Sequence, residues 1–308
     1  MLFADTDRGR AFAKDPAVVK LNGIYYMYYS MAPNESPAMK SEWGLGRGIG
    51  VARSFNLRDW EKIGEINPEQ ECEKNGICAP GAIVLDGKVH LFYQTYGNGA
   101  KDAICHAVSD NGLRFAKNSS NPVFSPTGEW NNGRAIDADV IVWDERLFMY
   151  FATRDPLGKT QMQGVAIAEL NSGFGHGAWH QACDSSILKP ELPWEQECIE
   201  AAAVCNREGR LFMFYGGAYN NCPQQIGCAV SEDGITWTRL SQEPFLPNGG
   251  PGSWNACESG HPFLFTDEDG RTYLFYQGNA DMGRTWYLSV TEIGWRNGLP
   301  YNKGEFSI

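Results

Sequence analysis

The stretch DPAVVKLNGIYYMYYS (residues 15–30) opens with an acidic residue, runs through a short apolar segment, turns at Asn22-Gly23 and enters a run of tyrosines. Two strand-like runs joined by an Asn-Gly pair are typical of a β-hairpin. The same order returns four more times: APGAIVLDGKVHLFYQ (79–94), DADVIVWDERLFMYFA (137–152), EAAAVCNREGRLFMFYGG (200–217) and HPFLFTDEDGRTYLFYQG (261–278). The chain therefore predicts five similar hairpins.

The openings of these hairpins lie 64, 58, 63 and 61 residues apart, at Asp15, Ala79, Asp137, Glu200 and His261. Repeats of about this size that are built from strands are typical of a β-propeller. Five repeats fill the chain, so we predict an all-β fold, a single five-bladed β-propeller domain over residues 1–308. Because a propeller brings equivalent positions of its blades to one axis, we expect Asp15, Asp137 and Glu200 to meet in a pocket there.

The composition narrows the class of partner. The 308 residues carry a formal net charge of −11, which argues against nucleic acid or an anionic membrane as partner and suits a neutral, hydroxyl-rich substrate. No segment approaches the run of about 20 apolar residues that spans a membrane. The sequence therefore favours a carbohydrate or another small polar molecule as the partner.

The cysteines bear on the cellular compartment. There are nine of them, an odd number that argues against a complete disulfide framework, and the absence of a CxxC pair argues against zinc. The first residues, MLFADTDRGRAFAKDP, lack the basic start and apolar run of a signal peptide. We expect a reducing, cytoplasmic compartment.

Three converging carboxylates are suited to the hydrolysis of glycosidic bonds. One protonated carboxyl must donate a proton to the leaving oxygen, and a second carboxylate must activate water or attack carbon. A third negative charge nearby keeps the acid protonated near neutral pH, because like charges resist joint ionisation. We therefore expect acid and base to come from Asp15, Asp137 and Glu200.

Two of these positions have rivals nearby in the sequence. Asp139 competes with Asp137, since residues two apart on a strand share a face, and the repeat register favours Asp137. Glu195 and Glu197 compete with Glu200. Glu200 is favoured because it opens an otherwise apolar strand, where a carboxylate is costly to bury without a purpose.

The five openings resemble the blade starts of glycoside hydrolase family 43, in order and over essentially the whole chain. The segments that carry the resemblance are KDPAVVKLNG, CAPGAIVLDG, IDADVIVWDE, PWEQECIEAAAVC and GHPFLFTDEDG. That family shares a five-bladed propeller with families 32, 62 and 68. It inverts the configuration of the sugar, so the resemblance implies that water attacks the anomeric carbon.

The resemblance implies a role for each matched residue. Asp15 would be the general base, Glu200 the general acid, and Asp137 the residue that tunes the protonation of the acid and orients it. His261 would be the axial histidine, which in many family members lies beside a calcium ion or a water. No cofactor is expected to be required, and a calcium ion near His261 is the one metal implied.

Two features depart from the family pattern. Cys78 stands where the family often has a tryptophan before Ala-Pro, which removes an expected sugar platform. The segments Arg154-Asp155-Pro156 and Glu197-Cys198 are similar to the RDP and EC motifs of the fructan-cleaving family 32. Both lie out of register with the blade starts, and they keep a family 32-like retaining fructosidase as a second hypothesis.

The predicted function is an inverting glycosidase with an arabinofuranoside or xyloside as substrate. Arg154, Arg284 and Trp194 are candidate substrate contacts, among arginines and loop tryptophans that also include Trp43, Trp130, Trp254 and Trp286. A non-catalytic sugar-binding propeller and a glycoside phosphorylase are hypotheses that the same fold would allow. A phosphorylase would need a basic cluster for phosphate, whereas the arginines look scattered in the sequence: Arg47, Arg53, Arg134, Arg154 and Arg284.

Overall fold

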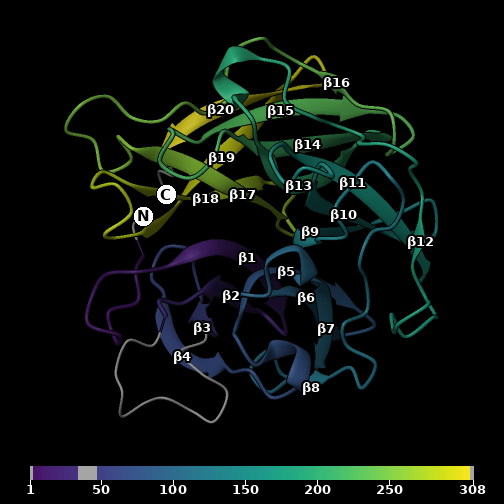
Figure 1. Cartoon of the computed structure of the whole chain (residues 1–308). Coiled ribbons are helices and arrows are strands. Elements are labelled where there is room, and N and C mark those ends of the chain that lie inside the picture. The colour runs from purple at the N-terminus through teal and green to yellow at the C-terminus, as the bar shows by residue number, and fades with distance from the viewer. Residues whose placement is uncertain (1–2, 34–46, 306–308) are drawn as a thin grey trace.

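The computed structural model describes residues 3–33 and 47–305, and within them it confirms the five-bladed propeller (Figure 1). Each blade is one sheet of four antiparallel strands, paired in chain order from the inside outward. Blade 1 is β1 (Lys14–Leu21), β2 (Ile24–Ser30), β3 (Ile49–Ser54) and β4 (Glu61–Ile66). Blade 2 is β5 (Ile77–Leu85), β6 (Lys88–Thr95), β7 (Ile104–Ser109) and β8 (Ala116–Lys117). Blade 3 is β9 (Ile136–Trp143), β10 (Arg146–Arg154), β11 (Gln161–Glu169) and β12 (His180–Gln181).

Blades 4 and 5 complete the ring. They are β13 (Ile199–Arg207), β14 (Arg210–Gly217), β15 (Gln225–Ser231), β16 (Thr238–Arg239), and β17 (Glu258–Thr266), β18 (Thr272–Asn279), β19 (Tyr287–Arg296), β20 (Leu299–Glu305). The only helices among the described residues are three single 3₁₀ turns, η2 (Glu71–Glu73), η3 (Gly99–Lys101) and η4 (Pro193–Glu195). The five inner strands therefore begin within three residues of the predicted openings.

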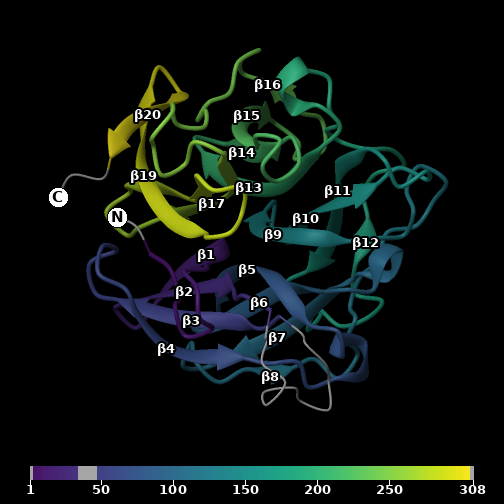
Figure 2. The same ribbon diagram turned by 60° about the vertical axis from the view of Figure 1, so that its left-hand side comes forward.

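The ring closes between the first and the last blade. The inner strands β1, β5, β9, β13 and β17 each contact the next, and β17 contacts β1 again. Near the N-terminus, Phe3 exchanges two backbone hydrogen bonds with Leu288 of β19, at 2.8 and 2.9 Å. Figure 2 shows the first blade, in purple, beside the last, in yellow. This pairing ties the start of the chain to the final blade.

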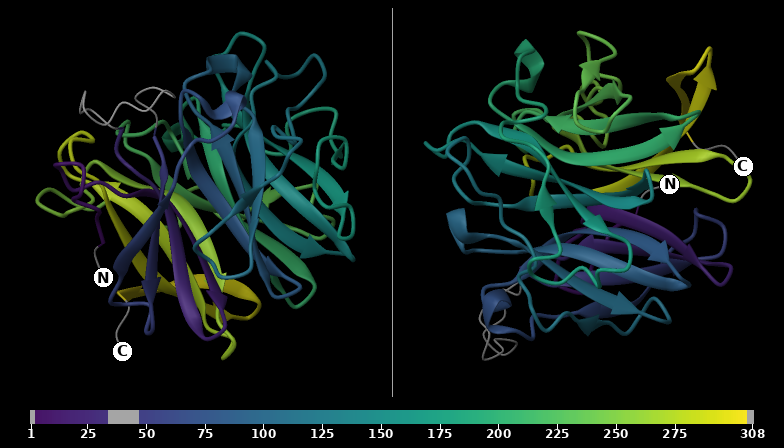
Figure 3. Two further views of the ribbon diagram at one scale, coloured as in Figure 1. Left: turned by 90° about the horizontal axis from the view of Figure 1, so that it is seen from below. Right: turned by 90° about the vertical axis from the view of Figure 1, so that its right-hand side faces the viewer.

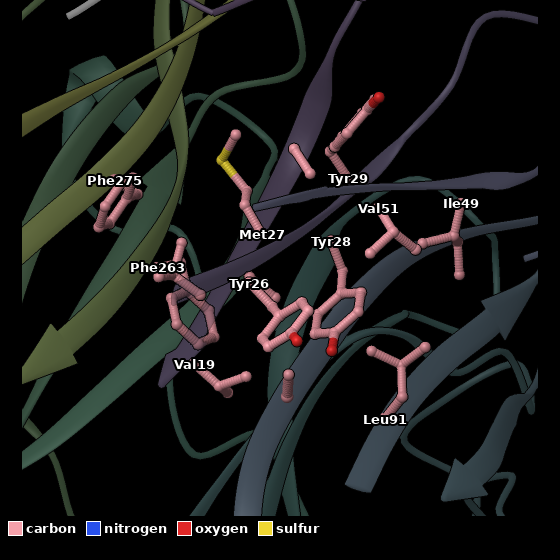
Figure 4. Close-up of a cluster of buried hydrophobic side chains, with 14 of the residues drawn as sticks. Val19, Tyr26, Met27, Tyr28, Tyr29, Ile49, Val51, Leu91, Phe263 and Phe275 are labelled. Atoms are coloured by element: carbon pink, nitrogen blue, oxygen red, sulfur yellow. The ribbon is translucent and has the colours of Figure 1, made fainter. Parts of the chain in front are cut away.

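Aromatic residues of the second strands form the core between blades. Tyr28, Tyr93, Tyr150 and Tyr215 are fully buried, and each hydroxyl has a partner: those of Tyr28 and Tyr150 donate to backbone carbonyls of Gly112 and Gly234. Figure 4 shows such a cluster between blades 1, 2 and 5. The middle-strand aromatics are thus packing residues.

A bulge near the start of each inner strand positions the axial side chains. The pairing register shifts there, and one residue per blade adopts a left-handed backbone: Asp15 (φ 53°), Ala79 (45°), Asp137 (53°), Ala201 (52°) and His261 (43°). Four of these are predicted openings, but in blade 4 the equivalent residue is Ala201. The sequence alignment of Glu200 with Asp15 is therefore wrong by one residue: Glu200 is equivalent to Lys14. Bulges of this kind re-aim side chains.

The sheets twist around the central axis, as the side views in Figure 3 show. Among the described residues, no helix has the length and apolar character needed to cross a membrane.

Candidate active site

One end of the central axis holds a pocket of about 190 Å³, and the three predicted carboxylates meet in it. Asp15, Asp137 and Glu200 come from three different blades and are only 6%, 8% and 6% exposed. The other lining residues are Lys14, Arg47, Cys78, Ala79, Gln94, Tyr96, Arg134, Ile136, Arg154, Gln161, Tyr219, Asn220 and His261. The lining includes residues with a left-handed backbone and residues that immediately precede them. Glu200 immediately precedes the left-handed Ala201, and it therefore still reaches the pocket.

The rival carboxylates have other surroundings. Asp139 lies farther along β9, against a cavity at the opposite end of the axis, and accepts a hydrogen bond from the Val204 backbone N–H at 2.8 Å. Glu195 is buried and held by the Arg239 guanidinium at 2.7 Å, whereas Glu197 is exposed and pairs with a lysine. None of the three rivals lines the pocket that holds Asp15, Asp137 and Glu200.

Asp15 is surrounded by groups that favour its charged form. His261 Nδ1 lies 3.1 Å from Asp15 Oδ1, and Lys14 Nζ lies 4.0 Å from the same oxygen. Burial acts to raise the pKa of Asp15, but His261, Lys14 and the Ser30 hydroxyl outweigh it, so the pKa lies below its usual value. Asp15 is therefore a carboxylate near neutral pH, as a general base must be.

Asp137 has the opposite electrostatic environment. Burial raises its pKa well above the usual range, and the neighbouring carboxyls of Glu200 and Asp15 raise it further. Its backbone N–H donates to Gln94 Oε1 at 2.9 Å, which fixes the bulge. Asp137 therefore keeps its proton near neutral pH.

Both oxygens of Glu200 are held by side-chain amides. Gln224 Nε2 donates to Oε1 at 2.6 Å, Gln161 Nε2 donates to Oε2, and Asn220 Nδ2 lies 3.4 Å from Oε1. These amides fix the direction of the carboxyl and so prepare it for one substrate geometry.

Sequence reasoning missed these amides, although a signal was present. Gln161 opens the apolar third strand QMQGVAIAE, and Gln224 stands immediately before the third strand QIGCAVS. Gln94 and Gln277 follow the aromatic run of their strands, and Gln277 Oε1 accepts the Asp15 backbone N–H at 2.9 Å. An amide at the end of a buried strand is therefore a candidate for a hydrogen bond to the next blade.

Four cationic side chains share the pocket with the carboxylates: Lys14, Arg47, Arg134 and Arg154. The arginines are scattered in the sequence but not in the folded chain. Three of the five arginines named from the sequence, Arg47, Arg134 and Arg154, line one pocket, so the expectation that they form no cluster is wrong. Arg134 Nη1 and Arg154 Nε both donate to Gln161 Oε1, at 3.3 and 3.1 Å. A buried donor without an acceptor costs about 1–3 kcal/mol, so such a cluster is costly unless a ligand uses it.

Of the three residues predicted to contact substrate, one lies in the pocket and two do not. Arg154 lines the pocket, whereas Arg284 and Trp194 lie outside its lining. Trp194 stacks on Tyr215 with ring centroids 6.0 Å apart and donates to the Gln242 carbonyl. The other loop tryptophans in the described residues, Trp130, Trp254 and Trp286, are also absent from the lining, and Trp43 lies outside the described residues. The pocket aromatics are Tyr96 and Tyr219.

The notable neighbour of His261 in the described residues is Asp15, and no set of metal-ligating side chains is found there. Calcium takes six to eight oxygen ligands. Within residues 3–33 and 47–305, no three His, Cys, Asp or Glu side chains gather in a way that could hold a metal. Burial lowers the pKa of His261, the Asp15 carboxylate opposes that shift, and Nδ1 of the imidazole faces Asp15. The calcium expectation stays a prediction, and His261 acts here as a partner of Asp15.

Comparisons with known proteins agree with this geometry. The family described as Glycosyl hydrolases family 43 matches residues 9–300. A protein of Thermoanaerobacter sp. (strain X514) described as 1,2-beta-oligomannan phosphorylase is 25% identical over 235 residues, 74% of this chain and 71% of that one.

Two solved structures share the propeller. A thermostable family-43 glycoside hydrolase has a TM-score of 0.75 at 21% identity and covers 98% of this chain and 96% of its own. The alpha-L-arabinofuranosidase from Lactobacillus brevis has a TM-score of 0.70 at 20% identity, with 96% and 95% covered. At these identities the two structures show a common fold.

Proposed function

The chain belongs to glycosyl hydrolase family 43 and is a glycoside hydrolase, and on this premise we propose that it removes single terminal sugars with inversion. The small pocket supports exo action: its volume of about 190 Å³ is below the range of about 300–1,000 Å³ typical of sites for larger ligands. The family and the likeness to an arabinofuranosidase favour an α-L-arabinofuranoside or a β-D-xyloside as the substrate.

In the proposed reaction, Glu200 protonates the glycosidic oxygen as the bond to the anomeric carbon breaks. Asp15 takes a proton from a water that attacks the opposite face of that carbon. Asp137, whose pKa is raised by burial and by the neighbouring Glu200, keeps a proton in the pocket until the substrate arrives. Gln161 and Gln224 hold the acid in place.

The observation that carries this proposal is that the pKa values of two carboxyls in one pocket are shifted in opposite directions. The pKa of Asp15 lies below its usual value and that of Asp137 far above it. Titratable groups whose environments separate their pKa values provide a base and a proton source at the same pH. A site that only bound sugar would have no need of this separation.

The direct test is a panel of nitrophenyl glycosides, led by α-L-arabinofuranoside and β-D-xyloside. We expect turnover of at least one of them by the native chain and its loss in Glu200→Gln. Asp139→Asn serves as the control, because it removes a buried carboxylate that does not line the pocket. Absence of turnover on the whole panel, or turnover that Glu200→Gln leaves unchanged, would contradict the proposal.

Phosphorolysis is the second candidate, favoured by the arginines in the pocket and by the likeness to the Thermoanaerobacter phosphorylase. Asp15 argues for hydrolysis, since phosphate is already an anionic nucleophile and needs no general base. The two reactions differ in one measurement: a phosphorylase releases a sugar phosphate and stops when phosphate is removed, whereas hydrolysis proceeds in phosphate-free buffer.

A further inference from the structure

The pocket contains more cationic side chains than its carboxyls pair with. We propose that Arg47, Arg134 and Arg154 form an oxyanion subsite that binds the carboxylate of a uronosyl unit in the substrate. The proposal deepens the glycosidase function above and rests on it. It makes the preferred substrate an acidic oligosaccharide, although the chain as a whole is acidic.

The first support is that, in the described part of the chain, these arginines form no close ion pair with the three carboxyls, although the charges of Arg47 and Arg134 act to lower the pKa values of Asp15 and Asp137, respectively. Among the described residues, none of the three forms an ion pair with Asp15, Asp137 or Glu200. The one ion pair that any of them forms there joins Arg134 Nε to Asp102 Oδ2, at 3.7 Å. The Nε atoms of Arg47 and Arg134 are buried, and neither has a hydrogen-bond acceptor in the described structure. The Nε of Arg134 faces Asp102, but all three arginines line the pocket, so a ligand there can reach the other N–H groups of their guanidiniums.

The second support is that the guanidinium groups are already held in place. Arg47 lies over the ring of Tyr96 at 4.7 Å, and Arg154 lies over the ring of Tyr219 at 5.5 Å. Arg134 shares the acceptor Gln161 Oε1 with Arg154. A planar guanidinium on an aromatic face matches a planar carboxylate with two parallel hydrogen bonds, which an ammonium group cannot do.

The position of the cluster favours an oxyanion on the sugar over inorganic phosphate. Arg134 and Arg154 bond to the Gln161 amide whose nitrogen donates to Glu200, so they lie on the acid side of the pocket. An attacking phosphate would instead lie beside Asp15, where it would meet an ionised carboxylate. A carboxylate that the sugar itself carries avoids this repulsion.

The test measures binding without turnover. Isothermal titration calorimetry on full-length Glu200→Gln compares glucuronosyl and galacturonosyl disaccharides with their methyl esters, at low ionic strength. We expect at least one acid to bind about tenfold or more tighter than its ester, and added salt to reduce that difference. Equal affinity of acid and ester across the panel would overturn the subsite.

Variants in the same background assign the effect. Arg154→Met and Arg47→Met, checked for folding by circular dichroism, should each remove most of the preference for the acid, and Arg154→Lys should restore it only in part. Arg53→Met is the matched control, because Arg53 is half-exposed, does not line the pocket and pairs with Glu61 at 2.9 Å on the outer strands β3 and β4 of blade 1. A preference that survives in both arginine variants contradicts the assignment.

Two further outcomes are informative. One distinguishes inorganic phosphate from a uronosyl carboxylate as the bound oxyanion, and the other distinguishes failure of the subsite from failure of the proposed glycosidase function. Cleavage that requires inorganic phosphate would overturn the uronosyl assignment and identify phosphate as the oxyanion. Uronosyl binding without cleavage of any glycoside by the native chain would support the subsite while contradicting the proposed function.

Discussion

The two ends of the central axis are built from the same five strands and differ in chemistry. At one end the strands begin with bulges, and the pocket of about 190 Å³ gathers Asp15, Asp137 and Glu200. At the other end the same strands run on regularly and enclose about 470 Å³, lined by residues 18–20, 82–84, 139–141, 204–206 and 263–268. The larger cavity therefore lacks the cluster of three buried carboxyls that the smaller pocket has.

The difference lies in the backbone. At the bulged end one residue of each inner strand is left-handed, which re-aims the side chains around it. Lys14 with Asp15 and Ile136 with Asp137 line the pocket at these bulges. The bulged end can thus crowd carboxylates and cations together, whereas at the far end Asp139 is the one carboxyl buried on an inner strand of that cavity.

The largest expected effect separates the two ends directly. Asp15→Ala should lower kcat by about 10³-fold, because a positioned base contributes about 10²–10⁴-fold. Asp139→Asn should change kcat by less than about threefold. Steady-state kinetics on the best nitrophenyl substrate measure both, and equal losses would remove the distinction between the ends.

A second large effect sharpens the role of Glu200. Glu200→Gln should reduce turnover by about 10²–10⁴-fold on substrates with poor leaving groups, since these need a proton on the leaving oxygen. Activated aryl glycosides need less help and should lose less. If both kinds of substrate lose activity equally, Glu200 is not the general acid.

An intermediate effect tests the amide that positions the acid. Gln161→Leu should lower kcat by about 10- to 100-fold, with a smaller change in KM, because Glu200 and the Arg134–Arg154 pair lose a common partner. Gln163→Leu is a matched control on the same strand, since the Gln163 amide is buried with no partner in the described structure and does not line the pocket. Similar losses in both variants would point to packing alone.

The smallest effect concerns stability at the far end. Burial raises the pKa of Asp139 to about 7, above its value in the unfolded chain, so the folded state holds a proton that the unfolded state has lost. This contribution is full below about pH 4 and is lost as pH rises through about 7, which amounts to at most about 3 kcal/mol between pH 5 and pH 8. Urea unfolding should show that Asp139→Asn gains stability relative to the native chain over that interval. A constant difference would mean that Asp139 does not titrate there.

Much of the fold was readable because its signals are local. The alternation of apolar residues, the Asn22-Gly23 turn and the tyrosine run of residues 25–29 fix one hairpin, and repetition fixes the blade count. The three carboxylates followed, since a repeat predicts which positions meet at the axis. The one-residue offset of Glu200 could not be read, because a bulge leaves no mark in a sequence where Glu and Ala both fit the strand.

The arginine cluster lay beyond sequence reasoning for another reason. Arg47 precedes β3, Arg134 precedes β9 and Arg154 ends β10, so none occupies an equivalent repeat position. Their convergence depends on the path of loops between blades and on stacking partners such as Tyr96 and Tyr219. Such contacts have no period, and only the folded chain brings them together.

The measurement that tests the central claim most directly is proton NMR of the first sugar released, recorded before mutarotation. If Asp15 activates water, the product appears with the configuration opposite to that of the substrate, and the carboxyls of Asp15 and Glu200 lie about 6.5–9.5 Å apart. A first product with the configuration of the substrate would make Asp15 a nucleophile and would contradict the account.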